Sequence, residues 1–344
     1  MKLNKKFASA AFGIVLGLSL SWFLLRTSGG HDGIVSALNN IFNRVADADT
    51  GLLLGAFALF LLSQILRAFR WMILSFGKKV PFSLSMPVTS IHVGLGHLLP
   101  VRLSDVAFVG LFKHFGSIPV GYGTATVVLA KLLDLVAMGI IIGSAVAAGV
   151  GEMAYVAPIL VLIGSLGIIF IVPLLRAIRK PSVWVLQKLM PGEITHWFDD
   201  LLEASSVKGK KGKLASAFLV SLIAWISKLL MFCLLLESLG ITGIPLWKIF
   251  FASGVTDLTM ALPVHGLLSL GTVEAGWAAG FAMVGIEGIV ASGTNIIELG
   301  FSVHLLWMFM AVFLMILAIP WLWFILLNKH RHRVSMNSTY KDSN

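Results

Sequence analysis

The chain of 344 residues is 58% hydrophobic and 12% charged, whereas soluble globular proteins average roughly 45–50% apolar and about 25% charged residues. This composition excludes a water-soluble enzyme. The formal charge of +10 would suit a nucleic-acid-binding protein, but the basic residues lie between apolar runs, as the charges that flank membrane spans do. We therefore expect no nucleic-acid partner. The single cysteine, Cys233, excludes an intrachain disulfide and a thiolate metal site.

Apolar stretches long enough to cross a membrane follow one another along the chain. Runs without a charged residue cover residues 7–25, 50–66, 80–101, 114–130, 135–151, 153–175 and 299–328. A helix needs roughly 20 apolar residues to cross the hydrocarbon core of a bilayer. The sequence therefore predicts an all-α polytopic membrane protein, with about eight membrane-spanning helices.

The positions of the basic residues predict the orientation in the membrane. Three lysines precede the first predicted span at residues 7–25, and the following loop at 26–49 has more acids than bases. Because positive flanks are retained in the cytoplasm, the N-terminus is predicted inside and this loop outside. The next predicted span is followed by four basic residues with no acidic residue among them, so its end is predicted to be cytoplasmic: Arg67, Arg70, Lys78 and Lys79. Spans near 120–149 and 154–175 then cross outward and return.

A basic amphipathic segment at residues 176–213 is predicted to be a cytoplasmic linker between two membrane halves, 1–175 and 214–327. The basic tail at 328–344 is predicted to be cytoplasmic as well. The expected location is the inner (plasma) membrane of a bacterium or archaeon, with both termini in the cytoplasm. Residues 286–327 could hold one steep span plus a partial one, or two spans, and two would leave the tail outside unless an earlier span is counted wrongly.

A weak internal repeat relates the two halves. Six residues recur 163 positions later without a gap: Ser75, Gly77, Ser90, Leu99, Pro100 and Val101 recur as Ser238, Gly240, Ser253, Leu262, Pro263 and Val264. Each copy holds a pair of short apolar segments broken at a proline, near 84–116 and near 246–285. Such pairs in two oppositely oriented halves are typical of transporters, because the broken helices free backbone groups that a polar substrate can satisfy. The alternative is two ordinary helical hairpins with proline kinks.

Ionisable residues inside apolar sequence are candidate functional residues, because burying them in a membrane costs free energy. In the first half these are Arg102, Asp105, Lys131 and Asp134, and in the second half Lys228, Asp257, His265, Glu274 and Glu298, with the polar Asn295 three residues before Glu298. Lys131 and Asp134 are three residues apart on one helix face, so their pairing with each other is an alternative. Arg67 and Arg70 lie where a helix leaves the membrane, and snorkelling to the headgroups is the favoured interpretation for them. No catalytic or metal-binding motif is present, and we expect no cofactor.

Several motifs resemble those of a known family. They are Arg67-Ala68-Phe69-Arg70-Trp71, Leu98-Leu99-Pro100-Val101-Arg102-Leu103-Ser104-Asp105, Lys131-x-x-Asp134 and Leu270-Gly271-Thr272-Val273-Glu274-Ala275-Gly276. The sequence is similar to the lysylphosphatidylglycerol synthetase transmembrane-domain proteins, which are flippase-like. The resemblance implies two inverted halves with re-entrant helices and a role in moving lipids. Because only 17 residues follow Leu327, we expect no soluble aminoacyl-transferase domain of the kind that bifunctional members carry. Lys131 stands where the family usually has an arginine, so we expect a difference from the family in the substrate rather than in the fold.

We therefore predict a lipid translocase and not an enzyme. Arg70, Arg102 and Lys131 are expected to attract an anionic headgroup, while Asp105, Asp134, Glu274 and Glu298 hold these bases in place or carry protons. The candidate substrates are a phospholipid, an aminoacylated phospholipid or a polyprenyl-phosphate-linked sugar. The alternative is a non-transporting membrane subunit that presents lipid to a glycosyltransferase or another envelope-synthesis partner.

Overall fold

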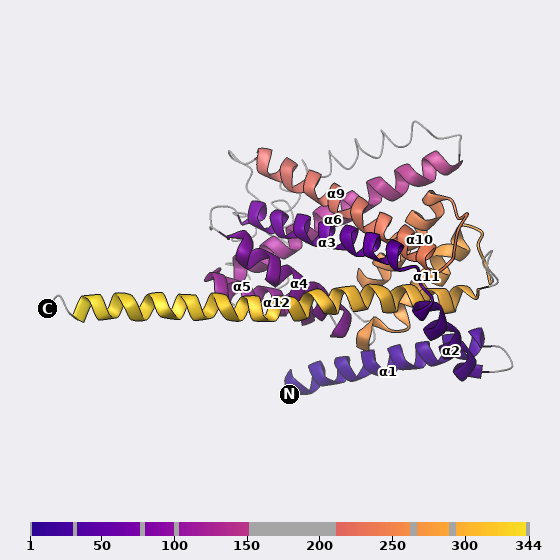
Figure 1. Ribbon diagram of the computed structural model, residues 1–344, viewed down its shortest axis with the longest axis horizontal. Coiled ribbons are helices and arrows are strands. Elements are labelled where there is room, and N and C mark those ends of the chain that lie inside the picture. Colours follow the sequence, from indigo (N-terminus) through magenta and orange to yellow (C-terminus); the bar gives the residue numbers. More distant parts are fainter. Residues whose placement is uncertain are drawn as a thin grey trace.

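Long apolar helices form the body of the protein (Figure 1). The computed structural model describes residues 2–29, 33–75, 80–99, 103–150, 211–261, 267–288 and 294–341. Its helices are α1 (Lys2–Ser28), α2 (Gly33–Ala46), α3 (Thr50–Leu74), α4 (Phe82–Leu98), α5 (Leu103–Gly116), α6 (Val120–Val150), α9 (Lys211–Ser238), α10 (Leu246–Ala261), the 3-10 turn η2 (Leu267–Ser269), α11 (Thr272–Met283) and α12 (Ile296–Lys341).

Four of the described helices are long and apolar enough to cross a membrane: α3, α6, α9 and α12. Each presents large apolar side chains outward, such as Leu54, Val120, Leu219 and Phe309. Backbone groups in a lipid environment must be satisfied within the helix itself, which is why such sequences form continuous helices. The predicted all-α membrane protein is confirmed. The predicted span at 154–175 and almost all of the predicted linker at 176–213 lie outside the described residues.

Helices α3 and α9 pack along each other near the centre of the structure. Gly55 lets the two helices approach closely, because a Cβ atom at this position would lie 3.1 Å from the side chain of Leu234. Nearby, the hydroxyl of Ser63 donates a hydrogen bond of 2.9 Å to the carbonyl oxygen of Ala224. Small residues and interhelical hydrogen bonds are the usual means of helix association in a membrane. This contact joins the two halves of the chain.

Four short helices correspond to the short apolar segments expected from the sequence: α4, α5, α10 and α11. The longest, α4, has 17 residues and is therefore about 26 Å long, less than the roughly 30 Å of the hydrocarbon core. Helix α4 packs against α5, and α10 packs against α11. The expected helix-breaking residues Pro100 and Pro263 lie outside the described residues.

The C-terminal region is one continuous helix, α12, which contains one candidate span at Ile296–Ile325. The alternative of two spans over residues 286–327 is therefore wrong. Proline is tolerated at position 320 within this helix, since membrane helices often re-satisfy the carbonyl that a proline frees. In Figure 1, the N-terminal end of α1 and the C-terminal end of α12 point to the same side of the bundle.

Candidate functional site

A cavity of about 510 Å³ lies where helices from both halves of the chain meet. Its walls come from α3, α4, α5 and α6 of the first half and from α9, α10 and α12 of the second. Ionisable side chains are concentrated in its lining: Arg67, Arg70, His92, His97, Asp105, Lys131, Asp134, Lys228 and Asp257. Among the described residues, the tertiary structure thus gathers most of the charges that lie within apolar sequence at one place.

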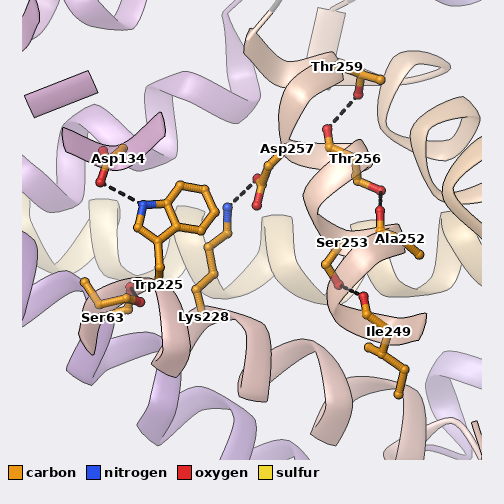
Figure 2. A network of polar contacts seen from close by, with 11 residues as sticks. Ser63, Asp134, Trp225, Lys228, Ile249, Ala252, Ser253, Thr256, Asp257 and Thr259 are labelled. Carbon is orange, nitrogen blue, oxygen red and sulfur yellow. Dashed lines mark hydrogen bonds and ion pairs between the residues drawn. The ribbon is translucent and has the colours of Figure 1, made fainter. Parts of the chain in front are cut away.

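Arg70 on α3 forms a buried ion pair with Asp134 on α6. The arginine side chain is 2% exposed, and its Nη1 also donates a hydrogen bond of 2.9 Å to the hydroxyl of Ser221. Asp134 accepts a further hydrogen bond of 2.8 Å from the indole Nε1 of Trp225 (Figure 2). A buried charge needs such partners to offset its loss of hydration. Snorkelling, the interpretation that the sequence favoured for Arg70, is therefore wrong.

Lys131 on α6 pairs with Asp105 at the start of α5. Its Nζ donates a hydrogen bond of 2.6 Å to Oδ2 of Asp105, whose Oδ1 lies 2.9 Å from Nε2 of His92 on α4. Lys131 and Asp134 therefore bond to partners on other helices, although the sequence allowed them to neutralise each other. Their spacing of three residues instead directs both side chains to the same cavity.

The second half contributes a third ion pair, between Lys228 on α9 and Asp257 on α10 (Figure 2). The lysine Nζ lies 2.5 Å from Oδ1 of Asp257 and also lies over the rings of Trp225 and Trp307, at 5.0 and 4.5 Å from their centres. Contact with ring faces stabilises a cation that has lost its water. Nearby hydroxyls on α10 bond to carbonyl groups of their own helix, as Thr256 does to Ala252.

Arg67 differs from the other basic residues of the cavity. Within the described part of the chain it has no ion-pair partner, and its guanidinium carbon lies 5.5 Å from the centre of the Trp225 ring. The other basic side chains of the lining are matched one to one by carboxylates. The described lining therefore carries one positive charge more than negative charges when its histidines are neutral, a property suited to an anion.

Two further candidate carboxylates lie away from this cavity. Glu274, in the first turn of α11, is completely buried and bonds to Nδ1 of His304 at 2.6 Å. Glu298, near the start of α12, accepts weak hydrogen bonds from Asn40 and lines a separate open cavity with Asp47 and other polar residues. The structure thus brings together Arg70, Asp105, Lys131 and Asp134 of the predicted site residues, but not these two.

Sequence reasoning missed several polar partners. Asn40, His92 and His304 pair with carboxylates on other helices, and no local pattern marks such long-range contacts. Asn295 caps α12, because its Oδ1 accepts a hydrogen bond of 2.9 Å from the backbone of Ile297. Two residues singled out in the sequence, Arg102 and His265, lie outside the described residues.

The site offers charge and hydrogen bonds rather than the geometry of a metal centre. Within the described ranges, no group of three or more His, Cys, Asp or Glu side chains is placed to hold a metal ion. Ion pairs that line a cavity can exchange partners, since an anionic group that enters can replace a carboxylate next to an arginine or lysine. The arrangement therefore suits the transient binding of an anionic group at membrane depth.

Comparison with known proteins agrees with this description. The family model described as the lysylphosphatidylglycerol synthase TM region matches residues 10–297. No match was found among the curated proteins or among the solved structures. The matched region includes α3 to α11 and every ionisable residue that lines the central cavity. The protein is an integral membrane protein related to lipid modification or translocation, and the chain belongs to the lysylphosphatidylglycerol synthase transmembrane-region family.

Proposed function

We propose that the protein is a lipid translocase that moves an anionic phospholipid or a polyprenyl-phosphate-linked lipid between the leaflets of the inner membrane. The headgroup passes through the central cavity, while the acyl or isoprenoid chains remain in the lipid. The observation that carries the proposal is the charged lining of a cavity of about 510 Å³. Charged groups at membrane depth are costly and typically mark a pathway for a polar substrate.

The charge of the lining favours an anionic headgroup over a cationic one. Arg67 has a guanidinium without an ion-pair partner among the described residues, next to the Arg70–Asp134 pair. Ser104 and Asp105, in the first turn of α5, also line the cavity, so the positive end of this helix lies beside it. A phosphate that enters would accept hydrogen bonds from Arg67 and compete with the carboxylates for the paired bases.

An inverted repeat would supply alternating access to this cavity. The order α3, α4, α5, α6 is matched by α9, α10, α11, α12, each with two short helices between two long ones. Packing follows the same correspondence, since α4 contacts α12 and α10 contacts α6. Asp105 and Glu274 are each the third residue of corresponding helices, α5 and α11. These features support the proposal that the four short helices are re-entrant and that the halves rock about the cavity.

A second candidate function is a non-transporting subunit that presents lipid to an envelope-synthesis partner. The observation that favours it is the pairing of charges in the cavity, because Arg70, Lys131 and Lys228 each already have a carboxylate partner. Pairs that hold helices together need not open during a cycle. Both candidates assign lipid binding to the cavity, but only the first predicts movement between leaflets.

Reconstituted flipping distinguishes the two. The protein is placed in liposomes with headgroup-labelled anionic or zwitterionic lipid, and a membrane-impermeant quencher is added outside. A translocase makes more than the outer-leaflet signal accessible to the quencher, and it does so faster for the anionic lipid. Signals equal to those of protein-free liposomes across several lipid classes would instead favour the lipid-presenting subunit.

Arg67→Gln tests the role of the cavity, with Arg26→Gln as the matched control on an exposed part of α1. A hydrogen bond to a charged group is worth about 1.5–3 kcal/mol, so we expect the substitution at Arg67 to slow anionic-lipid flipping by about 10- to 100-fold. The control should retain the original rate. Equal rates in both variants would show that the anionic headgroup does not pass Arg67.

A further inference from the structure

Glu274 and His304 form a buried pair outside the lining of the central cavity. Their side chains are 0% and 1% exposed, and Oε1 of Glu274 lies 2.6 Å from Nδ1 of His304. Gly300, one turn before His304 on α12, allows the close approach of α11, since a Cβ atom there would lie 3.3 Å from the Cβ of Trp277. The pair is therefore held by two tightly packed helices and is shielded from bulk solvent.

The pair has unused hydrogen-bonding capacity. Among the described residues, neither Oε2 of Glu274 nor Nε2 of His304 has a hydrogen-bond partner. On the same two helices, Val273 and Trp277 of α11 and Phe301 of α12 are buried as well. Buried polar atoms are nearly always satisfied in proteins, so two unsatisfied atoms on one pair call for a functional explanation. A carboxyl group and an imidazole that share a hydrogen bond can hold either one or two protons.

His97 on α4 connects this pair with the central cavity. The centre of its ring lies 5.8 Å from the ring centre of His304 and 4.3 Å from that of Trp307. Both His97 and Trp307 line the cavity. A rotation of one ring or a single bridging water would span the gap between the two imidazoles. In space, ionisable side chains therefore lead from His97 at the cavity, through His304, to Glu274.

Other titratable side chains occur on the described helices that pack against α11 and α12, and most of them already have partners. They are Arg26 beside Trp22, Arg44 bonded to the carbonyl of Leu239, His92 bonded to Asp105, Lys228 bonded to Asp257, Glu298 bonded to Asn40, Lys248 beside Trp247, and Lys213, Cys233 and Glu237 on α9. Asp257, which lines the cavity itself, also has one oxygen without a hydrogen-bond partner among the described residues, Oδ2. The unsatisfied Oε2 of Glu274 lies outside the lining, and His97 and His304 lie between it and the cavity.

We propose that Glu274, His304 and His97 form a proton relay that couples lipid movement to proton movement. This inference rests on the proposed translocase function. A proton bound by the Glu274–His304 pair adds one positive charge beside the cavity and so strengthens the binding of an anionic headgroup. By linkage, the bound headgroup strengthens proton binding by the same factor. Proton and lipid therefore cross in the same direction, and a lipid with one negative charge crosses with no net charge.

The test is the flip assay with a pH gradient imposed across the membrane of liposomes that contain the full-length protein. With one proton per lipid, a gradient of one pH unit should drive a singly charged lipid to about a tenfold leaflet ratio, because one pH unit is a tenfold ratio of proton activity. A membrane potential alone should have no effect. Glu274→Gln, which keeps the shape of the side chain but cannot titrate, should still equilibrate lipid yet abolish the response to the pH gradient. His304→Asn should do the same, and Glu287→Gln, on an exposed loop, should behave as the original chain.

Flipping by the original chain without a response to the gradient would overturn the proposal, as would a normal response in Glu274→Gln. If the original chain moves no lipid, the proposed translocase function is wrong. Infrared spectroscopy of the protein in detergent then tests separately whether Glu274 binds a proton. A carboxyl band that appears on acidification and is lost in Glu274→Gln but kept in Glu287→Gln would support proton binding at Glu274. The same band in both variants would exclude it.

Discussion

Asp134→Asn removes one charge from the buried pair between α3 and α6 while keeping the size of the side chain. Arg70, which is 2% exposed, would then retain its positive charge beside a neutral amide and the hydroxyl of Ser221, both of which can accept a hydrogen bond but carry no negative charge. Breaking a buried ion pair by removing one partner typically costs about 3–5 kcal/mol. Because Asp134 is 16% exposed toward the cavity, we expect the free energy of unfolding to fall by about 3 kcal/mol, the lower end of that range.

The pair between Lys131 and Asp105 provides the matched comparison. The lysine side chain is 40% exposed, so solvent in the cavity screens the pair, and pairs of this kind are worth about 0–1 kcal/mol. Lys131→Met should therefore lower the free energy of unfolding by less than Asp134→Asn does. Burial of the guanidinium, rather than the number of ion pairs, should determine which substitution destabilises the fold.

Unfolding by sodium dodecyl sulfate in mixed micelles, followed by tryptophan fluorescence, measures both changes. The double variant Arg70→Met/Asp134→Asn should regain part of the lost stability, because it leaves no unpaired charge. Equal losses for Asp134→Asn and Lys131→Met, or a double variant as unstable as the sum of its two single changes, would refute the reasoning.

Three other predictions follow from the packing and the cavity. Arg67→Gln should slow anionic-lipid flipping but leave the melting temperature within about 2 °C of its original value, since no ion pair is lost. A large fall in melting temperature would contradict the absence of an ion pair at Arg67 among the described residues. Gly280→Ala should destabilise by about 1–3 kcal/mol, because its Cβ would lie 2.6 Å from the Cα of Ala252, whereas Gly139→Ala meets nothing within 4 Å and should be neutral or stabilising. Cys233, which is 5% exposed, should react with a maleimide only after denaturation. Rapid labelling of the folded protein would contradict the buried position of Cys233 on α9.

The helical elements followed from local properties of the sequence. A charge-free apolar run of about 20 residues has few alternatives to a helix in a membrane, because its backbone groups must bond to each other. Helices α3 and α6 correspond to predicted spans, α12 contains the charge-free run at 299–328, and α4, α5, α10 and α11 correspond to the predicted short segments. The number of spans after residue 285 was ambiguous, since hydropathy does not distinguish one long helix from two with a proline between them.

The candidate site was only partly predictable. Membrane depth alone marks an ionisable residue as unusual, and this criterion identified Asp105, Lys131 and Asp134. For Arg70 it gave two interpretations, snorkelling and a place in the site, because a basic residue at the end of an apolar run has the same local pattern whether it reaches the headgroups or turns inward. It also missed His304, whose partner Glu274 is 30 residues away in the chain.

The sequence by itself determined that this chain resides in a membrane, that it is helical, and that charges occur within its apolar segments, because these properties depend on composition and on spacing along one helix. Only the tertiary structure decided which charges meet. Arg70 bonds to Asp134 across 64 positions, and Lys228 bonds to Asp257 across 29. Such pairings depend on how the helices rotate and approach one another, and packing between distant helices sets these angles rather than any local pattern.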